Sequence, residues 1–431
     1  MAQRLNPADD DFEVCFAKLV SASRGAVADV HKAVAEVLSE VAEKGDEALV
    51  QYTEEFDHHE TTAETLRITD DEIRAAVAQV SSEDRAALDL AAARIKTYHQ
   101  RQMPKDDIYK DDQGVELGGR WRPIQAVGIY VPGGKASYPS SVLMNAVPAR
   151  VAGVDRLVMC VPTPRGKLNP LVLAAAAISG VDEIYRVGGS QAIAAMAYGT
   201  DTIVPVHKIV GPGNAYVAEA KRQVFGKVGI DLIAGPSEIL VVADGQNNPE
   251  HTAWDLLAQA EHDETAQSIL ITDDHSFGDK VAASMAKHLK TLESTAIAHE
   301  SWTEHGAIIT VANLMEEAPA LINALAPEHL MLAVDDPDAM FEKVDHAGAV
   351  FLGRLTPEAI GDYVAGSNHV LPTNRSARFS SGLTIFDFLK RTSIVRTDSA
   401  ALAKIGPAAV RLAMAEGLPA HAASVSKRLK D

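Results

Sequence analysis

Apolar positions along this chain repeat with two different periods, and the change of period divides the sequence. Over residues 30–43, 46–56, 70–80 and 83–101, apolar side chains recur every three or four positions among strong helix formers, which predicts helices. After a polar, glycine-containing break at 111–119, short apolar runs alternate with helical segments. These runs, the predicted strands, are 126–131, 156–161, 183–187, 203–210, 239–243, 268–272, 307–311, 330–334 and 349–352.

Strands that alternate with helices indicate an α/β fold with largely parallel sheets, covered by helices on both faces. The strands are too numerous for one small sheet, so we expect two Rossmann-like units that are joined by a crossing at 231–237. The expected division is a helical N-terminal segment (1–28), a first unit (29–125 with 238–378), a second unit (126–237) and a C-terminal tail (379–431). The tail is predicted to be helical and to reach a partner chain.

Bulk composition narrows the classes of partner. The 431 residues carry 59 acidic and 40 basic side chains, a formal charge of −19. Such a surface repels phosphate backbones and anionic lipid, so neither nucleic acid nor membrane is an expected partner. No signal peptide and no membrane-length apolar run is recognised. Two cysteines, Cys15 and Cys160, cannot form a disulfide framework, and we expect a cytoplasmic setting.

Three glycine-containing turns follow predicted strands, and the last two of them also open predicted helices. They are 130–134, 187–191 and 211–216. Turns of this kind present backbone N–H groups to anions, and the carboxyl ends of parallel strands share one edge of a sheet. We therefore expect a nucleotide or phosphate ligand at these turns. None has the complete dinucleotide fingerprint, since Tyr216 replaces the third glycine, and ordinary strand-to-helix turns are the alternative.

Two groups of polar residues suggest metal and acid–base chemistry. Asp255, Gln259 and His262 are spaced to share one face of an apolar helix. Gln259 and His262, together with Asp362 and His421, provide nitrogen and oxygen donors that suit zinc, manganese or cobalt in a catalytic site. The adjacent pair of residues 328–329, a glutamate and a histidine before a strand, can divide two proton transfers. The alternative for the first group is that its side chains are solvated or simply hydrogen-bonded, and for the second that it is a solvated pair in a loop.

Cysteine chemistry is rejected as a mechanism. Cys160 lies within an apolar strand, where a thiol is buried and inert, and Cys15 has no polar constellation around it.

Several long strings resemble the histidinol dehydrogenase family. The strings are IVGPGNAYVAEAKRQVFGKVGIDLIAGPSEILVVAD (209–244), DLLAQAEHDE (255–264), APEHL (326–330), GDYVAGSNHVLPT (361–373), ARFSSGLTIFDFLKRTS (377–393) and AEGLPAHAAS (415–424). They occur in order between residues 209 and 424, and the resemblance covers essentially the whole chain.

The resemblance implies oxidation of L-histidinol through L-histidinal to L-histidine with two NAD molecules and one zinc ion per subunit. It also implies a homodimer with shared active sites and incomplete Rossmann units. The implied residues are the zinc ligands Gln259, His262, Asp362 and the partner's His421, the bases Glu328 and His329, the NAD contacts Tyr130, Gln191 and Asn214, and the substrate contacts Ser237, Gln259, His262, His329, Asp362, Glu416 and His421. His421 and Glu416 are expected from the partner subunit's tail.

Three other readings remain open from the sequence. Relatives with similar zinc and base motifs oxidise sulfonated propanediols. A zinc hydrolase without a nucleotide would use Glu328 as its base. A metal-stabilised binding protein would carry no activity. The 377–393 string and Glu416 favour oxidation of histidinol over the sulfonated propanediols, and the glycine turns favour it over the hydrolase. Chelation would distinguish the binding protein, since it should lower stability without any loss of activity.

Overall fold

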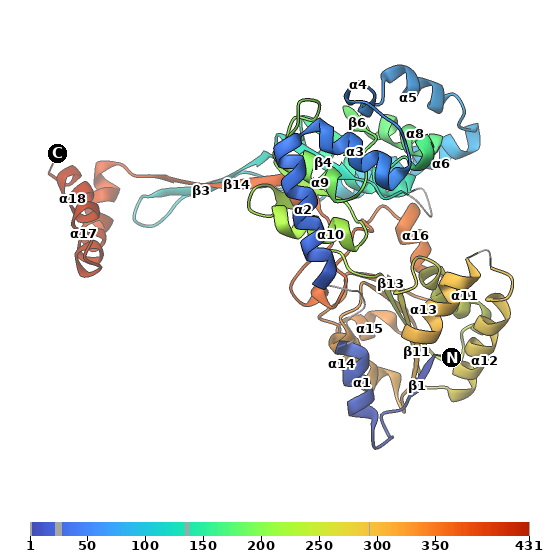
Figure 1. The fold of residues 1–431 in the computed structure, drawn as a ribbon. Helices are drawn as coiled ribbons and strands as arrows, with labels where there is room; N and C mark the ends of the chain where they lie inside the picture. The colour runs from blue at the N-terminus through green and yellow to red at the C-terminus, as the bar shows by residue number, and fades with distance from the viewer. Residues whose placement is uncertain (1, 22–27, 134–137, 293, 431) are drawn as a thin grey trace.

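The computed structural model describes residues 2–21, 28–133, 138–292 and 294–430. Two bodies, each built on a parallel sheet, lie next to one another, and a long ribbon carries two further helices away from them (Figure 1). The α/β class with parallel sheets is thus confirmed. No helix within the described ranges is both long and apolar enough to cross a membrane.

The first body is built on a five-stranded sheet in the order β6-β5-β4-β7-β8, with every pair parallel. Its strands are β4 (Ala126–Tyr130), β5 (Arg156–Cys160), β6 (Glu183–Tyr185), β7 (Lys208–Val210) and β8 (Gly229–Ile230). Its crossover helices are α7 (Pro139–Ala152), α8 (Pro170–Ser179), α9 (Gly189–Tyr198) and α10 (Ala215–Val224). All five residues of β4 are buried, as expected for a central strand with helices on both faces.

The N-terminal helices cover this same sheet. They are α2 (Ala28–Lys44), α3 (Asp46–Asp57), α4 (Ala63–Leu66), α5 (Asp70–Val77) and α6 (Ser82–Gln100). Helix α2 packs on α9 and α10, α5 on α8, and α6 on α7. The structure therefore groups these helices with 126–237, whereas the sequence division placed 29–125 with 238–378. Periodicity shows which face of a helix is apolar, but it does not show which sheet that face will cover.

The second body is built on a six-stranded parallel sheet in the order β1-β11-β10-β9-β12-β13. Its strands are β1 (Gln3–Leu5), β9 (Glu238–Ala243), β10 (Gln267–Thr272), β11 (Ala307–Thr310), β12 (His329–Ala333) and β13 (Ala349–Leu352). Its helices are α1 (Phe12–Ser21), α11 (Pro249–Ala260), α12 (His275–His288), α13 (Thr295–His305), α14 (Leu314–Leu325), α15 (Pro337–Phe341) and α16 (Glu358–Tyr363). Because β1 pairs with β11, the N-terminal segment is not purely helical, as 1–28 was predicted to be.

The ribbon consists of three antiparallel strands in the order β14-β3-β2. These are β2 (Asp107–Lys110), β3 (Glu116–Pro123) and β14 (Leu389–Arg396), and the helices at the far end are α17 (Ser399–Ala415) and α18 (Pro419–Arg428). We call this ribbon with its two helices the arm. The prediction of a helical tail over 379–431 is wrong for β14. Most of β14 is exposed, so it has no apolar alternation from which a strand is recognised.

Within the described residues the chain also forms three 3-10 turns, which are η1 (Pro164–Gly166), η2 (Ser376–Arg378) and η3 (Ile385–Phe388).

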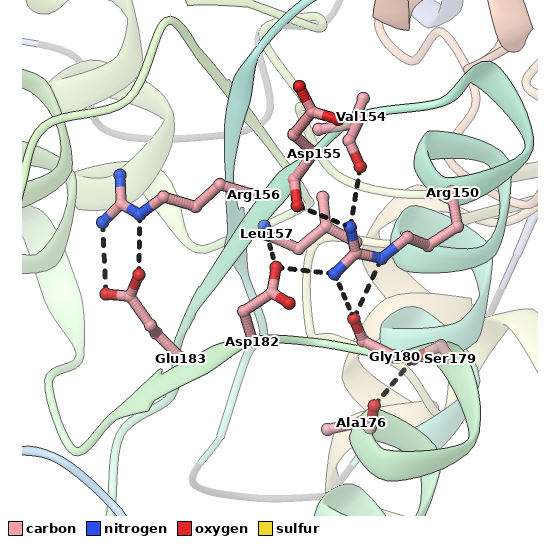
Figure 2. A network of polar contacts seen from close by, with 10 residues as sticks. All are labelled: Arg150, Val154, Asp155, Arg156, Leu157, Ala176, Ser179, Gly180, Asp182 and Glu183. Atoms are coloured by element: carbon pink, nitrogen blue, oxygen red, sulfur yellow. Dashed lines mark hydrogen bonds and ion pairs between the residues drawn. The ribbon is translucent and has the colours of Figure 1, made fainter.

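A polar network fixes the amino edge of the five-stranded sheet (Figure 2). Arg150, in the last turn of α7, donates to the carbonyl groups of Gly180, Val154 and Asp155 and to the Asp182 carboxylate. An arginine suits this place because the carbonyls at the end of α8 carry partial negative charge. The network lies at the opposite end of the strands from the glycine turns.

Candidate active site

The residues predicted for catalysis and metal binding, His421 excepted, gather at the amino edge of the six-stranded sheet. His329 is the first residue of β12, and the neighbouring strand β9 begins at Glu238. Helix α11 follows β9 and returns to this edge, so Gln259 in its last turn lies there too. Helix α16, which carries Asp362, contacts both α11 and β12.

The backbone of Glu238 orients both members of the Glu328–His329 pair. Its N–H donates to Glu328 Oε2 at 2.8 Å, and its carbonyl lies 3.0 Å from His329 Nδ1. A carbonyl can only accept, so Nδ1 carries the proton and Nε2 keeps its lone pair. The pair is buried, with 5% of each residue exposed. The imidazole is therefore prepared as a base at Nε2.

Two carboxylates of α16 face that nitrogen. Glu358 Oε1 is 3.5 Å and Asp362 Oδ1 is 3.9 Å from His329 Nε2. The ligand atoms of these three residues lie within 4.8 Å of one another, close enough to surround a cation. His369 joins the group, since its Nδ1 is 3.7 Å from Asp362 Oδ1.

Burial dominates the electrostatics of this cluster. It raises the pKa of Glu358 to about 9, helped by the negative charge of Asp362. Burial also raises the pKa of Glu328 well above its usual value, against the opposing hydrogen bond from Glu238. The same desolvation lowers the pKa of His329, against the opposing charge of Asp362. Without a bound cation, the site thus favours neutral acids and a neutral imidazole.

Gln259 and His262 are arranged as metal ligands would be. Gln259 is 1% exposed, and its Oε1 has no hydrogen-bond partner among the described residues. His262 Nδ1 lies 2.7 Å from the Ala258 carbonyl, so Nε2 is left as the free donor atom. A buried amide oxygen without a partner costs about 1–3 kcal/mol, and a cation would remove that cost. The donor set fits zinc.

One detail of the sequence prediction changes. Helix α11 ends at Ala260, so His262 lies in the turn beyond it and not on the same helix face as Asp255 and Gln259. The N–H of His262 still donates to the Gln259 carbonyl at 3.2 Å, which keeps the two residues together.

The predicted nucleotide contacts lie at the carboxyl edge of the five-stranded sheet. Tyr130 ends β4, Gln191 lies in the first turn of α9, and Asn214 caps α10 by accepting the N–H groups of Tyr216 and Val217. The Tyr130 hydroxyl accepts the N–H of Gly189 at 3.1 Å, which joins two of the three turns. Of the first turn, Gly134 lies outside the described residues.

Two expected site residues lie elsewhere. Glu416 and His421 line a hollow of about 330 Å³ between α17 and α18, at the end of the arm. In Figure 1 the arm points away from the body that holds Asp362, so one chain does not bring these residues together. Ser237, by contrast, directly precedes β9 and lies at the edge where Glu328 and His329 are held.

Sequence reasoning missed Glu358 and His369. Glu358 lies four residues before Asp362, which is the spacing of neighbours on one helix face. That signal was available once 358–363 was recognised as a helix. His369 is in an irregular segment, and only the fold places it: its Nδ1 is 3.1 Å from the Asp362 carbonyl.

Comparisons with known proteins agree with this geometry. The family model described as histidinol dehydrogenase matches residues 21–429. Histidinol dehydrogenase from Rhodospirillum rubrum is 61% identical and that from Ruegeria pomeroyi 60%, each alignment covering 100% of this chain and 99% of the relative. The crystal structure of histidinol dehydrogenase from Elizabethkingia anophelis superposes with a TM-score of 0.94 at 38% identity, over 100% of this chain and 98% of that one.

This chain belongs to the histidinol dehydrogenase family. It is accordingly an enzyme, and the resemblance of its strings to that family is confirmed over nearly the whole sequence. Within this histidinol dehydrogenase fold, burial raises the pKa of the Cys160 thiol in β5 to about 12, so no thiolate forms there at neutral pH. Cys15 lies in α1 beside Asp11, among residues that take no part in the site.

Proposed function

We propose that the protein oxidises L-histidinol through L-histidinal to L-histidine, with two NAD molecules and one zinc ion per subunit, at the end of histidine biosynthesis in the cytoplasm. The family supports a place in histidine biosynthesis. The observation that carries the chemistry is the buried His329, whose Nε2 lone pair faces Glu358 and Asp362.

Zinc would be held by Gln259, His262, Asp362 and the partner subunit's His421. When bound, it would hold the amino and imidazole nitrogens of the substrate and so fix the alcohol carbon toward the nicotinamide. Ser237 and the partner subunit's Glu416 would complete the substrate pocket. Support comes from the unpartnered Gln259 Oε1 and the donor nitrogen of His262.

His329 would accept the hydroxyl proton at Nε2 in the first oxidation. Its Nδ1–H donates to the Glu238 carbonyl, and this hydrogen bond holds the ring in the orientation that leaves Nε2 free to accept the proton. Glu328 would then activate the water that hydrates the aldehyde, and His329 would take the proton of the second oxidation. The raised pKa of Glu328 makes its carboxylate a stronger base than an exposed one.

NAD would bind across the three turns that hold Tyr130, Gln191 and Asn214. Gln191 is 1% exposed and its Oε1 has no partner in the described part of the chain, so it can accept a hydrogen bond from the ligand. Along the chain the turns come before the 231–237 crossing, and the base pair comes after it.

The active site would be completed by a second copy of the chain. The arm exposes apolar side chains, with Leu412 64% and Met414 57% exposed, next to Glu416 and His421. Exposed apolar surface on an extended arm is typical of an intersubunit contact.

Mixing two inactive variants tests the exchange of arms. His421→Ala and His329→Asn would each abolish turnover, because each homodimer lacks one component in both sites. A mixed dimer contains one intact site, so random reassociation should restore about a quarter of the sites. Absence of any recovered activity in verified mixed dimers would show that the arm serves its own chain.

The overall reaction is tested by counting NADH. We expect two NADH per L-histidinol, and this yield should be lost on chelation and restored by zinc. The proposal would be refuted if a sulfonated propanediol were the better substrate or if no NADH formed.

Glu328→Gln should slow aldehyde oxidation much more than alcohol oxidation. His329→Asn should suppress the first hydride transfer in a single turnover, and near-normal reduction of NAD by this variant would remove its assigned role.

A further inference from the structure

Gly211 lies at the centre of the turns assigned to NAD. Its φ of +115° is a conformation that side chains other than glycine rarely adopt. A Cβ on Gly211 would lie 2.1 Å from the Tyr130 carbonyl oxygen, so the two backbones are in direct contact. The conformation of this one residue therefore sets how the 211–214 turn sits against the end of β4.

A buried ion pair holds both polar backbone groups of Gly211. Asp231 Oδ2 accepts its N–H at 2.7 Å, and Lys221 Nζ donates to its carbonyl at 2.8 Å. Lys221 and Asp231 also form an ion pair with each other, with side chains 2% and 1% exposed. The lysine belongs to the last turn of α10, and its long side chain reaches back toward the beginning of that helix.

Apolar side chains at positions 221 and 231 would stabilise the folded chain about as well as the ion pair does. Removing two charges from water is costly, and a buried ion pair is often no more stable than apolar residues of similar volume. The ion pair instead provides directional hydrogen bonds. One carboxylate and one ammonium group fix a donor and an acceptor of the same glycine, which apolar packing cannot do.

We propose that Lys221 and Asp231 are positioning residues that hold the 211–214 turn in the shape that accepts NAD. Neither residue touches the site of chemistry. Their effect passes through Gly211 to Asn214, which caps α10, and to Tyr130, whose hydroxyl holds the N–H of Gly189. This inference rests on the proposed NAD site.

The test removes the pair without leaving a lone buried charge. The double variant Lys221→Met with Asp231→Asn is neutral and similar in volume. We expect it to fold and to retain zinc, with KM for L-histidinol and kcat at saturating NAD within about twofold, while KM for NAD rises about tenfold or more. The dissociation constant for NAD, measured by titration calorimetry, should rise by the same factor.

A matched control changes an ion pair of the same sheet that is far from the turns. Arg156 and Glu183 bridge β5 and β6 at their amino ends (Figure 2). Arg156→Met with Glu183→Gln should alter stability but leave KM for NAD unchanged. A folded Lys221/Asp231 double variant with an unchanged KM for NAD overturns the inference.

Two further outcomes are decisive. If the double variant does not fold, Lys221→Arg keeps the charge but displaces the donor, and its KM for NAD should rise; failure of both to fold would show that the pair serves the fold and not the turn. Absence of NAD reduction by the unmodified protein would instead refute the proposed function.

Discussion

Glu358 should make the metal-free protein less stable as the pH rises. In the folded chain burial and Asp362 raise its pKa to about 9, whereas an exposed glutamate titrates near 4.5. Between these values the folded state keeps a proton that the unfolded state has lost, so a higher pH favours unfolding. The slope is about 1.4 kcal/mol per pH unit, which gives about 2 kcal/mol between pH 7 and 8.5.

Urea unfolding of the chelated protein, at fixed protein concentration and followed by circular dichroism, measures this loss. Glu358→Gln is the control, because the amide has a similar shape and does not titrate. Glu328 also carries a raised pKa, but its main cause is burial, which is the same in both proteins, and the charge of Glu358 is the smallest of its causes. His329 and His369 have lowered pKa values and are neutral throughout this window.

The comparison isolates one carboxyl group. The unmodified chain should lose about 2 kcal/mol more than Glu358→Gln between the two pH values. Parallel stability curves for the two proteins would mean that Glu358 is already ionised when the metal is absent. The account of a site dominated by desolvation would then be wrong.

Three other substitutions probe the surrounding structure. Gln259→Leu should weaken zinc binding by about 100-fold or more, seen by competition with a chelator, while metal-free stability is kept or rises because an unpartnered oxygen is removed. Gly211→Ala should raise KM for NAD or prevent folding, since its Cβ would meet the Tyr130 carbonyl; normal kinetics in a folded variant would contradict this. Arg150→Met should cost about 2–4 kcal/mol in urea unfolding with kcat unchanged, as its bonds lie at the other end of the sheet.

Much of the fold could be predicted because buried parallel strands are recognisable in the sequence as short apolar runs. Each of the buried strands β4, β5, β9, β10 and β12 contains a short run of apolar residues, so their class and their order along the chain were predictable. The three glycine turns were predictable as neighbours for the same reason, since each follows a strand of one parallel sheet. The ribbon was not, because an exposed strand such as β14 lacks a buried face and its register depends on β3.

The candidate site was predictable only in part. Proximity of Gln259 and His262 follows from their spacing, and a glutamate–histidine pair before a strand is a local pattern. The contact between His329 and α16 is not local, because 29 positions separate His329 from Glu358 and the chain passes through β13 between them. Rules for α/β sheets place ligands at the carboxyl edge, yet this base pair begins its strand.

The nucleotide turns and the Glu328–His329 pair belong to different bodies, which the 231–237 crossing joins. The apolar clusters of the two bodies do not mix: those of the first body draw on residues 30–232 and 364–389, and those of the second on residues 2–20 and 239–352. The 231–237 crossing is instead tied by polar contacts. Asp231 holds Gly211 at one end, Gly235 donates its N–H to Thr373 Oγ1 in the middle, and Glu238 holds Glu328 and His329 just beyond the other end. Directional bonds thus set the separation of the nucleotide turns from the base, which a shared apolar core would leave less sharply defined.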